Sequence, residues 1–264
     1  MYAFDYQRPQ SVADAAKLGS SDNRYLAGGQ SLIQAMRLRL SQSERLVDLG
    51  AIADLKQIKA DANGVTIGAM ATHASVAANA DVKRAIPALA ELAGGIGDPM
   101  VRNMGTIGGS IANADPAACY PAGVLGLNAT IHTDRRTIAA DAFFTGLYET
   151  ALQPGELIVA VSFPAAQKAA YVKFKQPASR FALIGVCVAQ TAGGVRVGVT
   201  GAKAHAFRAT ELENALAKSF TAEAAKAVKM PTTDINADLH GSAEYRAAMI
   251  SVIASRAVAA ALAR

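Results

Sequence analysis

The chain has 264 residues, of which 52% are hydrophobic and 18% charged, and its formal net charge is +5 at pH 7. This composition is that of a globular protein and excludes an intrinsically disordered chain. Its basic residues are scattered, without the dense stripe and interleaved aromatics typical of nucleic-acid binding, so we expect no nucleic-acid partner.

Two cysteines, Cys119 and Cys187, are too few for a disulfide framework, an iron–sulfur cluster or a structural zinc site. The first residues lack the apolar core of a signal peptide, and no apolar run reaches the roughly 18 residues of a membrane span. We therefore expect a soluble cytoplasmic protein with no metal site and no membrane span.

Short strands and helices are expected to alternate over the first 93 residues. Ser11 has the chemistry of a helix N-cap, and the Asn63-Gly64 pair is typical of a turn before a strand. The expected ranges are a helix at 9–19, a strand at 24–27, a helix start at 32–40, strands at 46–49 and 65–69, and helices from 75 and at 86–93.

The middle of the chain is rich in glycine. Residues 94–113 contain too many glycines for a helix and too many apolar residues for a linker, so we expect a packed loop. Asp115 and Pro116 then predict a helix that runs to Leu127, with Asp115 as its N-cap and Pro116 at its first position. The next expected elements are a hairpin at 129–139 and a strand at 157–163.

A change in composition at 165–170 marks a candidate domain boundary. Three strand-like runs follow at 171–174, 181–190 and 195–201, with Gly193-Gly194 as the turn between the last two. The remaining residues are Ala-rich, with expected helices at 209–218, 222–228 and 243–263. Mixed strands and helices, then a meander, then helices predict an α+β fold.

Two segments pair adjacent glycines with a hydroxyl side chain. They are the first glycine loop, Ala27–Leu32, and the second glycine loop, Thr106–Ser110. Adjacent glycines permit positive φ and remove Cβ atoms, so that successive N–H groups before a helix start form an anion-binding cavity. The first loop alone is as consistent with a tight strand-to-helix turn, but two such loops favour one long diphosphate ligand held from both sides.

No pattern in the sequence indicates a catalytic centre. The glycine loops match neither the Walker pattern nor the three-glycine Rossmann spacing. Asp115 either caps a helix or accepts hydrogen bonds from a ribose or ribityl hydroxyl, and both cysteines are expected to be buried apolar residues. No Ser/His/Asp or paired-carboxylate arrangement stands out, so we expect no catalytic side chain. The histidines are too far apart for a metal site and are expected to be structural: His73, His132, His205 and His240.

Several motifs in a fixed order extend these observations. They are Leu26–Ile33, Met36–Leu40, Val65–Ala69 with Thr72-His73, Val101–Ser110 and Ala114–Ala118. With them, the chain resembles the FAD-binding medium subunit of molybdenum hydroxylases, the carbon monoxide dehydrogenase and xanthine dehydrogenase group. The resemblance covers nearly the whole chain, including Gly155–Ile158 and the meander from 171 to 201.

The resemblance implies a two-part FAD-binding domain of the vanillyl-alcohol-oxidase (PCMH) type at residues 1–165, with subdomains at about 1–55 and 56–165. A C-terminal α+β domain with a three-stranded antiparallel sheet and helices would occupy residues 166–264. It would make the chain an FAD-dependent oxidoreductase subunit.

The resemblance also implies the FAD contacts. Both glycine loops would hold the diphosphate, and Asp115 would lie near the ribose and ribityl chain. Ile96 would flank the flavin ring, Phe181 would lie over the isoalloxazine, and Lys175 and Ile158 fall in segments near the adenine end or the flavin edge. The expected cofactor-binding residues are Ala27, Gly28, Gly29, Gln30, Ser31, Leu32, Ile96, Thr106, Gly108, Gly109, Ser110, Asp115, Ile158, Lys175 and Phe181.

Two departures from the family pattern stand out. Cys119 occupies a position where many relatives have Asp or Glu, so one polar contact to FAD is expected to be missing or replaced. Some relatives also insert a cysteine-bearing loop for an extra [4Fe-4S] cluster, which this chain has too few cysteines to hold.

In the scheme that the resemblance implies, a molybdopterin-binding large subunit oxidises the substrate and a [2Fe-2S] small subunit relays electrons to FAD in this chain. The acceptor would be NAD, oxygen, a quinone or another oxidant, and the assembly a dimer of heterotrimers. The substrate is chosen in another subunit, and no NAD fingerprint is present here. Two alternatives are a stand-alone FAD-dependent oxidoreductase and a non-catalytic assembly subunit that has lost FAD.

Overall fold

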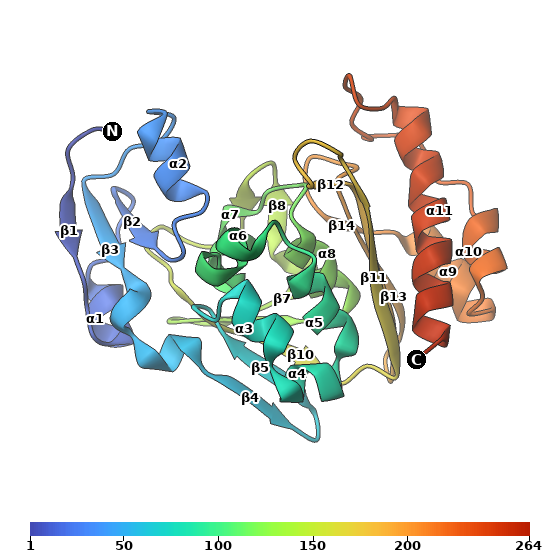
Figure 1. The fold of residues 1–264 in the computed structure, drawn as a ribbon, viewed down its shortest axis with the longest axis horizontal. Helices are drawn as coiled ribbons and strands as arrows, with labels where there is room; N and C mark the ends of the chain where they lie inside the picture. Colours follow the sequence, from blue (N-terminus) through green and yellow to red (C-terminus); the bar gives the residue numbers. More distant parts are fainter.

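The computed structural model describes residues 1–264 as an α+β fold with three β-sheets and a short two-stranded ribbon. Figure 1 shows three parts side by side in chain order. An N-terminal lobe in blue comes first, a central part in cyan and green follows, and a C-terminal sheet with its helices in gold to red comes last.

The N-terminal lobe is built on a small parallel sheet in the order β1-β3-β2. Ser11 caps the first helix as predicted, because its side chain accepts a hydrogen bond from the Asp14 N–H. A small core of seven buried residues packs the lobe against the central part, which contributes Met70 and Leu157 to it. Its elements are β1 (Asp5–Gln7), α1 (Val12–Lys17), β2 (Asn23–Leu26), α2 (Leu32–Arg37), β3 (Arg45–Asp48) and the 3-10 turns Leu49–Ala51 and Ala53–Lys56.

The central part has a five-stranded antiparallel sheet in the order β4-β5-β10-β6-β7. Its strands are β4 (Ile58–Asp61), β5 (Gly64–Gly68), β6 (Thr130–Thr133), β7 (Thr137–Ala139) and β10 (Ile158–Pro164). Its helices are α3 (His73–Ala78), α4 (Ala80–Ala85), α5 (Pro87–Gly94), α6 (Pro99–Met104), α7 (Ile107–Asn113) and α8 (Cys119–Gly126). A 3-10 turn, Ala140–Ala142, precedes the ribbon of β8 (Phe144–Gly146) and β9 (Glu149–Thr150).

Two sequence predictions in this part are wrong. Residues 94–113 form α6 and α7 rather than a loop, because Asp98 and Thr106 cap two helices that are each too short to be read from apolar spacing. The helix expected at Asp115 begins instead at Cys119. The Asp115 carboxylate accepts a hydrogen bond from the Ala117 N–H at 2.8 Å, which stabilises a turn, and the Thr200 hydroxyl donates to the Ala118 carbonyl at 2.8 Å.

The C-terminal sheet has four antiparallel strands in the order β11-β12-β13-β14, one more than predicted. The extra strand is only two residues long, which leaves no readable alternation in the sequence. The elements are β11 (Lys168–Lys175), β12 (Ala182–Thr191), β13 (Gly194–Thr200), β14 (Phe207–Arg208), α9 (Thr210–Lys218), α10 (Ala222–Ala227) and α11 (Ala243–Leu262).

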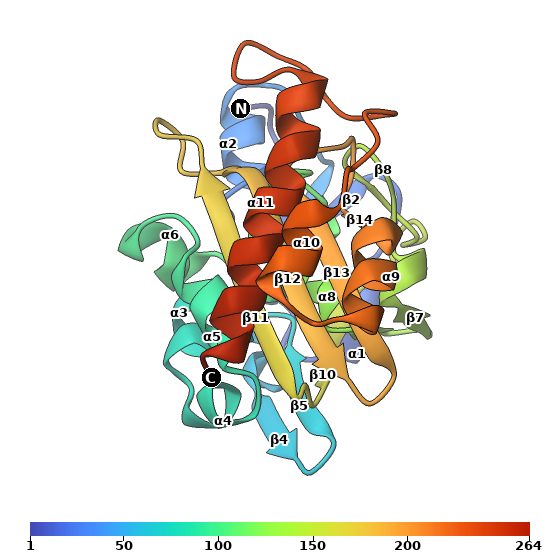
Figure 2. The same cartoon turned by 90° about the vertical axis from the view of Figure 1, so that its right-hand side faces the viewer.

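This sheet is covered on both faces. α11 lies across one face, as Figure 2 shows, and its residues share a core with Ile184, Val186 and Val188 of β12. On the other face, α8 approaches so closely that a Cβ on Gly198 of β13 would lie 2.2 Å from the Ala122 carbonyl oxygen. The alternate residues of β12 therefore belong to two different hydrophobic cores.

α11 is long and apolar enough to cross a membrane by length and composition. Its apolar side chains, Ile250, Ile253 and Val258 among them, are buried in the core beneath the C-terminal sheet. Packing against the sheet explains the hydropathy of this helix, and a role as a core helix accounts for it without a membrane.

Candidate cofactor-binding site

The two glycine loops, far apart in the sequence, meet in the structure. A Cβ placed on Gly28 would lie 1.9 Å from the Met104 carbonyl oxygen at the end of α6. A Cβ on Gly109 would lie 3.3 Å from the Cβ of Ala27. The first loop therefore packs directly on the segment that leads into the second, and only glycine fits at position 28.

The first glycine loop presents a run of unpaired backbone donors. No N–H group from Ala27 to Leu32 donates a hydrogen bond within the chain, and the first bonded one is that of Ile33, to the Gly29 carbonyl at 3.2 Å. Gly29 has φ +70°, which turns the backbone into α2. Successive unpaired N–H groups in a loop that leads into a helix are typical of an anion-binding site.

The second glycine loop has a different role. Its Ile107 and Gly108 N–H groups donate to the Ala71 and Ala69 carbonyls, at 3.1 and 2.9 Å, and the Gly109 N–H donates to the Thr106 hydroxyl at 3.1 Å. A Cβ on Gly108 would lie 2.6 Å from that of Ala69. Two of its donors thus seat α7 against the segment that follows β5, and a third is used in the cap of α7, so the two loops are not equivalent.

A cleft of about 590 Å³ opens where the loops meet. Four of its lining residues were predicted from the sequence: Ala27, Gly28, Gly29 and Thr106. The sequence reasoning missed its polar lining, which consists of Asp48, Lys56, Thr72, Ser75 and Asn103. Thr72 and Asn103 lay within matched motifs, and Thr72 also caps α3, and these were the signals available for the polar lining.

Two of the missed residues carry charge. The Asp48 carboxylate accepts hydrogen bonds from Tyr6 and from the Gly50 N–H and lies 3.3 Å from Arg8, so its charge is largely compensated. The Lys56 ammonium donates to the Gly50 carbonyl at 2.6 Å and has no carboxylate partner. This leaves a cationic side chain at the cleft beside the unpaired N–H groups, which suits a diphosphate.

Four of the other predicted residues, which do not line the cleft, differ in how far they are buried. Phe181 is 49% exposed and, with Lys175, brackets the turn between β11 and β12. That turn lies at the same end of the molecule as α2 in Figures 1 and 2. Asp115 is half-buried and contributes to raising the Tyr148 pKa, although burial is the larger cause. Ile158 is buried in the largest core and contributes no exposed side chain.

Cys119 is buried, as expected of a small apolar residue, but it has a polar neighbour. Its Sγ accepts a hydrogen bond from the Lys173 ammonium at 3.3 Å. Burial, with Cys119 nearby, also holds the pKa of Tyr171 well above its usual range. A thiol thus stands beside a lysine at this position.

His73 is packed between the site and the core. Its ring lies 5.4 Å from that of Tyr120, and a Cβ on Gly105 would lie 2.5 Å from its Nε2. Burial, with the nearby Arg102 charge, lowers the pKa of His73 to about 4. The ring is therefore neutral at pH 7.

A family model described as the FAD-binding domain in molybdopterin dehydrogenase matches residues 2–166. The chain belongs to that family. It is 37% identical to the carbon monoxide dehydrogenase medium chain of Hydrogenophaga pseudoflava, over 99% of this chain and 98% of that one. It is 34% identical to the glyceraldehyde dehydrogenase medium chain of Sulfolobus acidocaldarius, over 96% of each.

The fold agrees with these relatives. A solved structure of a Cu,Mo-CO dehydrogenase, in its cyanide-inactivated form, superposes with a TM-score of 0.88 at 36% identity, over 98% of each chain. The expected family, the α+β fold, the FAD cofactor and the oxidoreductase class are confirmed by these comparisons. The first glycine loop offers what the cofactor's diphosphate requires, so the residues present fit FAD.

Proposed function

We propose that this chain is the electron-transfer subunit of a molybdenum hydroxylase complex. It would take electrons from a [2Fe-2S] small subunit and pass them to an external acceptor, while a molybdopterin-binding large subunit oxidises the substrate. The observation that carries the proposal is the run of unpaired N–H groups from Ala27 to Leu32, closed off by the Gly28–Met104 contact. The medium-chain relatives, similar over almost their whole length, support it.

The residues of this chain would bind and orient the cofactor. The first glycine loop would hold the diphosphate through its N–H groups, with Lys56 adding a positive charge. The second loop, Gln30, Ser31 and Ser110 would contribute packing and hydroxyl or amide contacts. When bound, FAD supplies the redox chemistry, and the protein determines its position and electrostatic surroundings.

The remaining predicted contacts belong to the same proposal. Ile96 and Phe181 would flank the flavin ring, and Asp115 would accept hydrogen bonds from the ribose or ribityl hydroxyls. Lys175 and Ile158 would fall in segments near the adenine end or the flavin edge. We assign residues 1–165 to the FAD-binding domain, with subdomains at about 1–55 and 56–165, and residues 166–264 to the C-terminal domain. The complex would be a cytoplasmic dimer of heterotrimers.

Purification of the chain with and without its co-expressed partners tests the proposal. The expected result is a yellow protein with flavin absorbance bands that hydroxylates no substrate alone and co-purifies with a molybdenum-containing subunit. A colourless chain that still joins the complex would point to an assembly subunit without FAD. A flavin-loaded chain that turns over a substrate without partners would point to a stand-alone oxidoreductase, and either outcome contradicts the proposal.

A further inference from the structure

Two cations hold the backbone of the Gly95–Gly97 turn, which connects α5 to α6. The Lys173 ammonium, from β11, donates to the Gly95 carbonyl at 2.9 Å. The Arg102 guanidinium, from α6, donates to the Ile96 and Gly97 carbonyls, at 3.0 Å each. Three consecutive carbonyl groups are thus bonded to positively charged donors that come from two separate elements.

These cations are not engaged in ion pairs. Neither Lys173 nor Arg102 forms a salt bridge with a carboxylate, and the other polar contact of Lys173 is the Cys119 thiol. Both residues are half-buried, and a charge in such a position is costly unless polar groups solvate it. The carbonyl groups of the turn are the acceptors that do so. Hydrogen bonds from charged donors are about twice as strong as neutral ones, so these contacts hold the turn firmly.

The turn is connected to the first glycine loop through α6. Asp98 caps this helix by accepting from the Val101 N–H at 2.9 Å, one residue after the turn. The helix ends at Met104, whose carbonyl oxygen is the atom that Gly28 packs against. Since a helix of this length is a rigid rod of about 9 Å, a shift of the turn moves the Met104 carbonyl.

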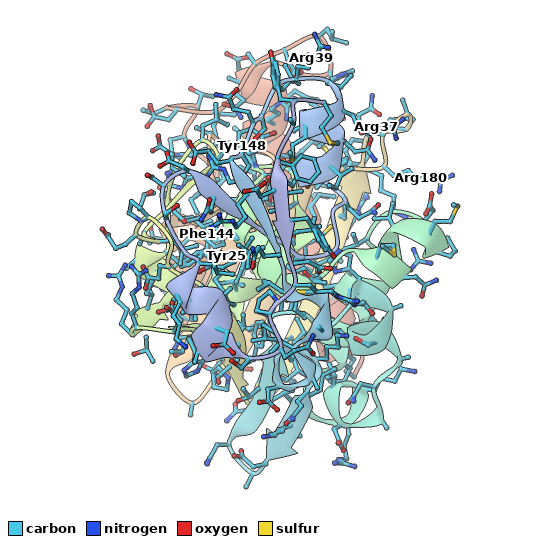
Figure 3. The ribbon with its side chains drawn as sticks, turned by 90° about the vertical axis from the view of Figure 1, so that its left-hand side faces the viewer. Tyr25, Arg37, Arg39, Phe144, Tyr148 and Arg180 are labelled. Carbon is cyan, nitrogen blue, oxygen red and sulfur yellow. The ribbon has the colours of Figure 1, made fainter.

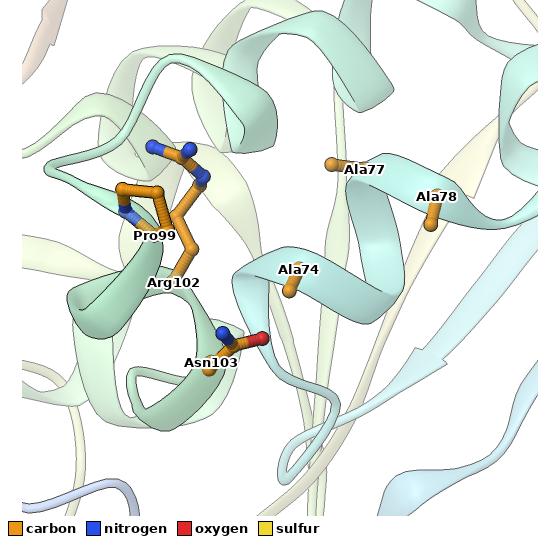
Figure 4. Close-up of a pocket in the computed structure, with 6 residues that line it drawn as sticks. All are labelled: Ala74, Ala77, Ala78, Pro99, Arg102 and Asn103. Atoms are coloured by element: carbon orange, nitrogen blue, oxygen red, sulfur yellow. The ribbon is translucent and has the colours of Figure 1, made fainter.

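Arg102 is accessible at one side of this arrangement. It lines a shallow pocket of about 300 Å³, and Figure 4 shows it on α6 across from Ala74, Ala77 and Ala78 of α3. α3 begins at His73, directly after Thr72, which lines the cofactor cleft. The same guanidinium thus sits where α3 and α6 face each other.

We propose that Lys173 and Arg102 are positioning residues of the cofactor site, acting together to fix the Gly95–Gly97 turn and, through α6, the wall against which the first glycine loop closes. This inference rests on the proposed function, because the ligand of that site is taken to be FAD and Ile96 to face its ring. Neither side chain is required to touch the cofactor.

The test uses the full chain and four variants: Lys173→Met, Arg102→Met, the double variant, and the conservative Lys173→Arg. Lys168→Met, on the same strand and without a hydrogen bond from its ammonium, is the matched control. FAD affinity is measured by fluorescence titration of the apoprotein, the flavin environment by visible circular dichroism of the loaded protein, and fold stability by thermal unfolding of the apoprotein.

Each Met variant at 173 or 102 is expected to raise the FAD dissociation constant roughly tenfold and to change the flavin circular dichroism. Because the two cations hold one turn, their effects should not be independent. The double variant should raise the FAD dissociation constant by less than the two single fold-increases multiplied together. Lys173→Arg should recover affinity to within about threefold of wild type, and Lys168→Met should match wild type.

Flavin spectra and affinities of Lys173→Met and Arg102→Met that equal those of Lys168→Met would overturn the proposal. So would losses of affinity that only follow losses of thermal stability, with no change in the flavin spectrum. A wild-type chain that takes up no FAD would instead contradict the proposed function, which separates the two failures.

Discussion

At the scale of single residues, the site depends on where a Cβ atom can and cannot be accommodated. Gly28 has no room for one because the Met104 carbonyl oxygen occupies its place, whereas a Cβ on Gly109 meets the Thr106 hydroxyl at 3.0 Å and the Ala27 Cβ at 3.3 Å. The two glycines therefore differ in their tolerance of substitution, although the sequence motifs treat them alike.

Gly28→Val is expected to abolish FAD retention, since the side chain would force the first glycine loop away from α6. Gly109→Ala is expected to weaken FAD binding only several-fold, because its neighbours need to give by a few tenths of an ångström. Flavin absorbance after gel filtration measures both. Gly193→Ala, where the nearest atom would be 3.7 Å away in an exposed turn, is the control, and full flavin occupancy in Gly28→Val would contradict the interpretation.

The glycine loops could be predicted from sequence because their chemistry is local: adjacent glycines, a hydroxyl and a helix start. The other half of the cleft could not. Asp48 and Lys56 reach it from segments whose neighbouring residues do not mark them, and Asn103 lies in the Val101–Ser110 motif without a signal of its own. Lys173 and Arg102 were missed for a related reason, since a side chain that bonds to a distant backbone carbonyl leaves no pattern in the sequence.

At the scale of elements, short helices depend on their caps. α7 has seven residues, and the Thr106 hydroxyl satisfies the Gly109 N–H in its first turn. Apolar periodicity is unreadable over so few residues, so the segment 94–113 was predicted as a loop from its glycine content. α11, with 20 residues, and the β12–β13 hairpin, with its Gly-Gly turn, were predicted correctly because they are long or carry a strong turn signal.

Thr106→Val is expected to lower the free energy of unfolding by about 1 kcal/mol, because it leaves the half-buried Gly109 N–H without its acceptor. Thr106→Ser keeps the acceptor and should lose much less. Urea denaturation of the apoprotein measures both. Equal stability of the Val and Ser variants would show that the cap contributes nothing.

A buried carboxylate ties the β6–β7 hairpin to the segment before β10. The Glu156 side chain, which is fully buried, accepts hydrogen bonds from Arg136 at 2.9 Å, Thr133 at 2.8 Å and the Gln153 N–H at 2.7 Å. Arg136 is the main reason that the Glu156 pKa falls to about 2.

Because this pKa lies below its ordinary value of 4.5, the contribution of Glu156 is present above that value and is lost as the pH falls towards 2. Glu156→Gln is expected to lower the free energy of unfolding at pH 7 by about 2 kcal/mol and to flatten its decline between pH 4.5 and 2. Denaturant melts over this range measure it. The exposed Glu223→Gln is the control, and an unchanged acid profile in Glu156→Gln would refute the assignment.

At the scale of the whole molecule, the C-terminal sheet lies between two hydrophobic cores and contributes residues to both. Cys187 and Ala189 of β12 join the core of the central part, and Ile184, Val186 and Val188 join the core beneath α11. The change in composition near residue 165 was readable in the sequence, but the continuity of packing across it was not. It depends on close contacts such as that of Gly198 with α8.

A chain truncated after residue 165 is therefore expected to be insoluble or to melt without a cooperative transition, because the face of α8 and its neighbours would be exposed to water. The full chain is expected to unfold those two parts together. Solubility and differential scanning calorimetry measure this. A monomeric 1–165 fragment with a sharp melting transition would show that the central part needs no support from the sheet.

The N-terminal lobe contributes no residue to the two cores that share the C-terminal sheet. Its core has only seven buried residues, of which Met70 and Leu157 come from the central part. The seam between the two also includes the hydrogen bond from Tyr25, labelled in Figure 3, to the Gly155 carbonyl at 3.0 Å. Yet this lobe carries the unpaired N–H groups, while α6 and the opposite wall belong to the larger body. Such a small unit opens at a lower free-energy cost than the whole protein. We therefore expect the lifetime of the bound cofactor to depend on how often this lobe opens, with cofactor loading and exchange proceeding while the remainder of the molecule stays folded.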